Sequence, residues 1–123
     1  MTSPEDIRSN FPEWPEMWEG LPEDVAYGDA LLVCFRPFIL HLIDKGLTGK
    51  TLRRHMDYLF LLGGQLVDNA RYEPDTPADA ATRLAESVSP DGGPYCKHLH
   101  SAADRKSYDA TCRKLHRFLS EAR

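Results

Sequence analysis

The sequence has few cysteines, only Cys34, Cys96 and Cys112 among 123 residues, and their number is odd. Small secreted domains normally carry a denser, even-numbered disulfide framework, so we expect reduced thiols here. The N-terminus lacks the basic-then-apolar pattern of a secretory leader, and no uninterrupted apolar run approaches the roughly 20 residues that cross a bilayer. These absences predict a cytoplasmic protein without a membrane partner.

Signatures of catalysis are also scarce. The sequence contains no paired-carboxylate motif, no serine elbow and no glycine loop followed by Lys-Ser or Lys-Thr. Cys34 and His41 are two helical turns apart, which is too far for the hydrogen bond that would activate a thiol nucleophile. We therefore expect a protein that is not an enzyme and that carries no cofactor.

Charge is distributed unevenly along the chain. Residues 1–30 carry eight acids and one basic residue, a net charge of −7, whereas residues 31–123 carry 14 Lys and Arg against 11 acids, a net charge of +3. The whole chain, at −4, would repel a polyanion weakly, but residues 31–123 would not. This asymmetry bears on every hypothesis about a partner.

The spacing of apolar residues predicts an all-α domain. Steps of three and four positions indicate helices over 27–45, 48–69, 76–88 and 101–122, and no alternation typical of strands is present. Pro37 is expected to kink or split the first helix, which Gly46 should end. We predict one compact bundle of about four helices over residues 25–123.

The second helix carries the clearest start signal. Thr48 is a good N-cap, and Leu47 is placed to pack on Leu52 with the spacing of a hydrophobic staple. Gly63 and Gly64 lie inside this helix and cost about 1 kcal/mol each relative to alanine. We therefore expect another helix to cross closely at these two glycines.

Residues 1–24 are predicted to form an acidic, extended arm with one helical turn around 15–19, because four prolines interrupt this segment. The arm either lies over the helical body or docks onto a partner. In the second case the chain would be a protein-interaction or regulatory module, and the side chains that would contact the partner are Phe11, Trp14, Met17 and Trp18.

Two groups of basic residues could contact the phosphates of a nucleic acid. The first lies around the start of the second helix and the second on the last helix: Lys45, Lys50, Arg53 and Arg54, then Lys106, Arg113, Lys114 and Arg117. The alternative is a solvated face balanced by Asp57, Asp109 and the acidic arm. A pI of about 5.7 slightly favours this alternative. A further hypothesis has the arm covering the basic face and so controlling binding.

A short cluster, Cys96, His98 and His100, has residue types that bind zinc. It makes a weak candidate metal site, because structural zinc needs four ligands and no second pair stands out. Cys112 or His116 could complete it only if the last helix folds back. The composition favours an exposed loop before a helix and no bound metal.

Parts of the chain resemble the core-binding domain of tyrosine recombinases and phage integrases, over about half of its length. The similar residues are Phe35, Phe38, Ile39, Leu42, Gly46, Leu47, Thr48, Thr51, Leu52, His55 and Leu59, then Thr111, Arg113, Leu115, Phe118 and Leu119. The resemblance implies a helical bundle that helps to clamp DNA, and a bacterial or phage origin. Residues 51–64 and 111–119 also resemble small stand-alone bacterial proteins of unassigned role.

This sequence departs from the recombinase pattern in three ways. The Arg, His and Tyr that perform strand exchange have no counterpart, so we expect no recombinase chemistry. Pro37 and the acidic, aromatic arm are further departures that weaken the implied contact with DNA. The resemblance and the basic groups together predict a non-catalytic helical binding module, possible partners being DNA or a protein, with the oligomeric state left open.

Overall fold

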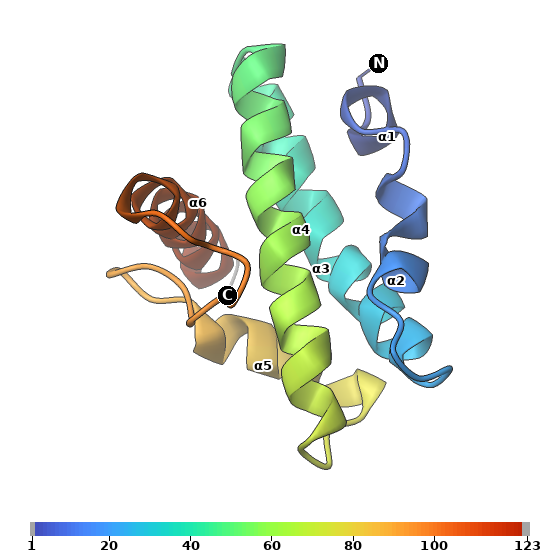
Figure 1. Cartoon of the computed structure of the whole chain (residues 1–123). Coiled ribbons are helices and arrows are strands. Elements are labelled where there is room, and N and C mark those ends of the chain that lie inside the picture. The colour runs from blue at the N-terminus through green and yellow to red at the C-terminus, as the bar shows by residue number, and fades with distance from the viewer. Residues whose placement is uncertain (1, 122–123) are drawn as a thin grey trace.

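The computed structural model describes residues 2–121, and the regular secondary structure of this part of the chain is entirely helical. Its elements are α1 (Pro4–Ile7), η1 (Phe11–Glu13), α2 (Trp14–Met17), α3 (Asp24–Asp44), α4 (Gly49–Arg71), η2 (Pro77–Asp79), α5 (Ala80–Ser87) and α6 (Ala102–Glu121). α3 and α4 form a central antiparallel pair, with the N-terminal elements on one side of α4 and α6 on the other (Figure 1). The predicted all-α fold is confirmed. The predicted end of the last helix, Ala122, lies outside the described residues.

Of the two alternatives predicted at Pro37, a kink or a split, the split is excluded, because α3 is a single helix of 21 residues that contains this proline. Proline removes the hydrogen bond to the carbonyl of Val33, four residues earlier. Val33 is 74% exposed and Pro37 is exposed as well, so water can hydrate that carbonyl. The opposite face of α3 is buried in the core and stabilises the continuous helix. Gly46 follows its end at φ +79°, as expected for a glycine that terminates a helix.

α3 is also the one described helix that is long and apolar enough, by length and composition, to cross a membrane. Between Asp29 and Asp44 its only charged residue is Arg36, which interrupts the apolar sequence. In this structure Leu31 and Phe35 of α3 are fully buried in the core.

The predicted N-cap of α4 is confirmed. The Thr48 hydroxyl accepts a hydrogen bond from the Thr51 N–H at 3.2 Å, and Leu47 packs against the core. The close approach predicted at the two glycines is also present, although the nearest neighbour is a tryptophan. A Cβ on Gly63 would lie 2.4 Å from Cη2 of Trp18, and one on Gly64 would lie 3.1 Å from Cδ1 of the same indole.

The N-terminal arm is docked on the helical body. Phe11, Trp14 and Trp18 are 0%, 2% and 7% exposed, and the Trp18 indole N–H donates to the Phe60 carbonyl at 3.1 Å. The expected extended conformation is wrong for much of the arm, because α1, η1 and α2 each carry a proline in their first two positions. Proline is favoured there, since its fixed φ suits a helix and its missing N–H would have no helical partner.

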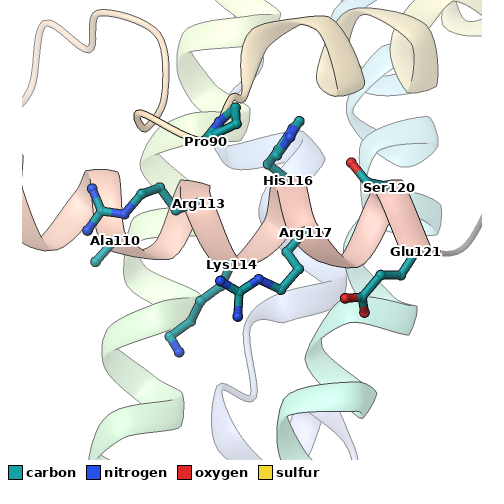
Figure 2. A pocket seen from close by; sticks show the side chains of 8 residues that line it. All are labelled: Pro90, Ala110, Arg113, Lys114, His116, Arg117, Ser120 and Glu121. Atoms are coloured by element: carbon teal, nitrogen blue, oxygen red, sulfur yellow. The ribbon is translucent and has the colours of Figure 1, made fainter.

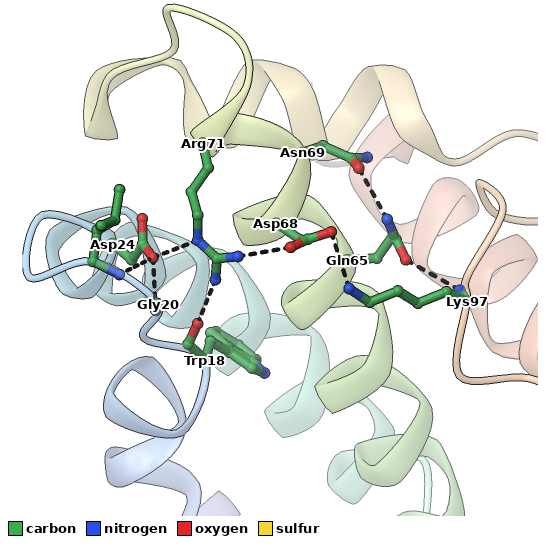
Figure 3. Close-up of polar contacts among 9 residues, drawn as sticks. Trp18, Gly20, Asp24, Gln65, Asp68, Asn69, Arg71 and Lys97 are labelled. Carbon is green, nitrogen blue, oxygen red and sulfur yellow. Dashed lines mark hydrogen bonds and ion pairs between the residues drawn. The ribbon is translucent and has the colours of Figure 1, made fainter.

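A polar network around Arg71 fastens the end of the arm to α4 (Figure 3). The guanidinium donates to Asp24 and to Asp68, both at 2.7 Å, and to the Trp18 carbonyl at 3.0 Å. Asp24 also accepts from the backbone N–H of Gly20 at 2.8 Å. One arginine at the end of α4 therefore holds the arm, the start of α3 and its own helix together.

The segment between α5 and α6 is fastened to the first turns of α6. Arg105 donates to the carbonyls of Gly93 and Pro94 at 2.9 and 3.1 Å, and the Tyr108 hydroxyl donates to Pro94 at 3.2 Å. The Ser101 hydroxyl caps the start of α6, since it accepts from the Asp104 N–H at 3.0 Å. These contacts fix the position from which α6 extends along the bundle.

Candidate nucleic-acid interface

The eight basic residues predicted to contact phosphates are all exposed. They come from three places: the turn between α3 and α4 carries Lys45, the first two turns of α4 carry Lys50, Arg53 and Arg54, and α6 carries Lys106, Arg113, Lys114 and Arg117. We refer to these eight side chains as the basic set.

Ion pairing separates the basic set from the other basic residues. Between residues 2 and 121, each basic side chain outside the set is paired with an acid, namely Arg8, Arg36, Arg71, Arg83, Lys97 and Arg105. No member of the basic set forms an ion pair with an acid in this same range. The positive charge that is not neutralised by a direct partner therefore belongs to the basic set.

The acids that were expected to balance this charge have other partners. Asp57 binds Arg8 through both carboxylate oxygens, at 3.1 and 2.8 Å. Asp109 accepts from Arg105 at 3.2 Å and from the backbone N–H of Gly93 at 3.0 Å. The arm lies on the side of α4 away from α6 (Figure 1), so the described arm does not cover the cations of α6.

A buried hydrogen bond brings the two basic groups together. His55 of α4 and Thr111 of α6 share this bond, with 2.7 Å between Nδ1 and Oγ1, and both residues are buried. Burial, together with the nearby charges of Lys114 and Arg54, lowers the pKa of His55 to about 4. The imidazole is therefore neutral near pH 7, with a cation from each helix close to it.

The outer face of α6 is hollowed by a shallow groove of about 520 Å³. Figure 2 shows its lining side chains, among them Arg113, Lys114 and Arg117 on α6 and Pro90 from the preceding segment. Glu121 is the one acid among the lining residues described. Three cations and one acid give this groove a net positive charge, which suits an anionic ligand.

The structure does not place every member of the basic set in one cluster. Lys45, Lys114 and Arg117 line one common groove, and Arg54 and Lys114 both lie close enough to His55 to lower its pKa. Arg53 instead turns back along the first turn of α4 toward Gly49. Lys106 lies near the other end of α6 and lines neither groove.

The four arm residues predicted to bind a partner have different environments. Phe11, Trp14 and Trp18 belong to the core of this chain, and their rings pack on one another and on Phe60. Met17 is 54% exposed and is the only one of the four that is displayed at the surface. The alternative in which the arm lies over the body accounts for the three aromatic side chains.

The weak candidate metal site is not assembled. Cys96 is 1% exposed and packs in the core, whereas His98 and His100 are exposed. The expectation that this segment is an exposed loop is therefore wrong for Cys96. Among residues 2–121, no group of three or more His, Cys, Asp or Glu side chains is placed to hold a metal ion. Burial raises the pKa of the Cys112 thiol to about 12, so this thiol remains protonated near neutral pH.

Sequence reasoning missed the residues that shape the basic surface without carrying its charge. His55 and Thr111 join the two helices, and His116, Ser120 and Pro90 line the outer groove. His116 lies three residues after Arg113, and Ser120 lies three residues after Arg117. Side chains three or four positions apart on a helix lie on one face, so the sequence places His116 and Ser120 beside these cations. Pro90 carries no such signal, because its place depends on how the segment before α6 folds back.

No protein-family model, no curated protein and no solved structure matches the chain.

Proposed function

We propose that this chain is a non-catalytic helical module that binds nucleic acid through phosphate contacts made by the basic set. The observation that supports the proposal is the division among the basic side chains. Those of the basic set have no acidic partner in the described part of the chain, whereas the remaining basic residues there are ion-paired. Unpaired, exposed cations can exchange their counterions for phosphates at little cost.

The spacing of the cations along α6 suits an elongated ligand. Lys106 and Arg117 are eleven positions apart on this helix, which corresponds to about 16 Å along its axis. One strand of B-DNA rises about 3.4 Å per nucleotide, so this distance matches about five nucleotides. Phosphate contacts of this kind position a protein on the polymer but do not read its sequence. We therefore expect binding with little sequence preference.

A fluorescence-anisotropy titration with a labelled DNA duplex at several salt concentrations tests this proposal. Each phosphate contact contributes about 0.9 to the slope of log K against log salt. In the double variant Arg113→Gln/Arg117→Gln, we expect weaker binding and a slope that is smaller by about 2. The control Arg36→Gln/Lys97→Gln changes the net charge equally but removes cations outside the basic set, so its slope should be unchanged.

Two outcomes would refute the proposal. One is the absence of measurable binding for the unmodified chain at about 20 mM salt, where electrostatic attraction is strongest. The other is an equal loss in both double variants, which would mean that only the net charge of the molecule matters. Circular dichroism of each variant checks that its helical content is retained.

A further inference from the structure

A second, smaller groove lies where the C-terminal end of α3 meets the second half of α6. Its volume is about 190 Å³, and its lining includes Lys45, Lys114 and Arg117. Pockets that enclose a whole drug-sized ligand measure about 300 Å³ or more. This groove is therefore of a size to receive one chemical group of a larger molecule.

The charges that line this groove favour an anion. Lys45 comes from the turn after α3 and the other two cations from α6, so separate elements direct three positive charges to one place. None of the three is ion-paired within the described residues. Glu121 is the one acid among the lining residues, so Lys45, Lys114, Arg117 and Glu121 together carry a net charge of about +2.

Packed aromatic rings form one wall of the same groove. Phe118 packs on Phe38 of the core and on His41, with ring centroids 5.6 and 5.0 Å apart. This packing holds the α3 and α6 walls together. The backbones that carry the three cations therefore need not be brought together when a ligand binds, which lowers the entropic cost of binding.

We infer that this groove binds a terminal phosphate, the phosphomonoester at the end of a nucleic-acid strand. The inference rests on the proposed function and names the part of the ligand that the groove selects. A phosphomonoester carries a charge of about −1.5 to −2 at pH 7. A phosphodiester within a strand carries only −1. Because three cations converge here, the more highly charged group gains more from them.

The test compares two labelled duplexes that differ only in whether their strand ends carry phosphate or hydroxyl groups. One phosphorylated duplex carries the group at its 5′ ends and another at its 3′ ends, so either polarity is detected. We expect the unmodified chain to bind one phosphorylated duplex about tenfold more tightly than the hydroxyl-ended one, as for about one charge-assisted hydrogen bond. In Lys45→Gln/Arg117→Gln this preference should disappear, so that the duplexes bind with about equal affinity, while the hydroxyl-ended duplex still binds.

The matched control is Lys50→Gln/Lys106→Gln, which removes two cations of the basic set outside this groove. This variant should bind every duplex more weakly and keep the tenfold preference. Equal binding of all duplexes by the unmodified chain would overturn the inference and leave the proposed function standing. An unaltered preference in Lys45→Gln/Arg117→Gln would also overturn it. Absence of binding to any duplex would overturn both proposals.

Discussion

The contact between Gly63 and the Trp18 indole can be tested by comparing Gly63→Ala with Gly64→Ala, because the gain in helix propensity is the same for both and cancels in the comparison. A Cβ added to Gly63 would lie 2.4 and 2.5 Å from two ring carbons of Trp18, and 3.2 Å from Phe35. One added to Gly64 would lie 3.1 Å or more from the same indole. Both substitutions gain about 1 kcal/mol of helix propensity. Overpacking a buried site costs about 1–3 kcal/mol. Because the Trp18 indole is rigid and only 7% exposed, we expect the cost of Gly63→Ala to lie at the upper end of this range.

We therefore expect Gly63→Ala to lower the free energy of unfolding by about 2 kcal/mol relative to Gly64→Ala, which should stay within about 1 kcal/mol of the unmodified chain. Urea unfolding followed by circular dichroism measures this difference. Repeating both substitutions in a Trp18→Leu background should remove most of it, because the ring that clashes is gone. The explanation fails if Gly63→Ala is as stable as Gly64→Ala, or if the difference persists without the indole.

Two further predictions concern the polar groups that join the elements. Arg71→Met should lower the free energy of unfolding by about 3 kcal/mol, because it leaves the Asp24 side chain, 7% exposed, without its cation. Arg8→Met breaks an exposed ion pair and should cost less than about 1 kcal/mol in the same urea assay; similar losses would contradict this. His55, with its pKa lowered from 6.5 to about 4, binds a proton more readily in the unfolded chain. Its contribution to stability is therefore complete above pH 6.5 and is lost as the pH falls toward 4, by about 2 kcal/mol at pH 5. In His55→Gln, unfolding measured at pH 7 and pH 5 should show this decrease reduced, and an unchanged decrease would contradict the assignment.

Helix boundaries could be predicted where the signal is local. Thr48 caps α4 and Gly46 ends α3 as expected, because each depends only on backbone groups a few residues away. Whether Pro37 would split the helix could not be decided from the sequence, because the cost of the proline depends on whether the freed carbonyl faces water and on how much apolar surface the opposite face buries. Neither quantity can be determined from the proline itself.

The candidate interface was only partly predictable. The exposed cations of the two helices follow from their positions outside the apolar stripes, and residue type identifies them as phosphate ligands. Their lack of acidic partners could not be predicted, because Asp57 and Asp109 lie near them in the sequence but bind Arg8 and Arg105. The pairing of an acid depends on which side of a helix it faces and on which element packs beside it.

The sequence by itself determined the all-α class, the main helices and the net charge of each segment, since periodicity, caps and composition act over a few residues. Only the tertiary structure decided that the N-terminal arm is part of the core, that Trp18 fills the space over Gly63 and Gly64, and which cations remain unpaired. Trp18 and Gly63 are 45 positions apart, and Arg8 and Asp57 are 49 apart. Contacts over such separations form only when several helices pack together, so no local pattern encodes them.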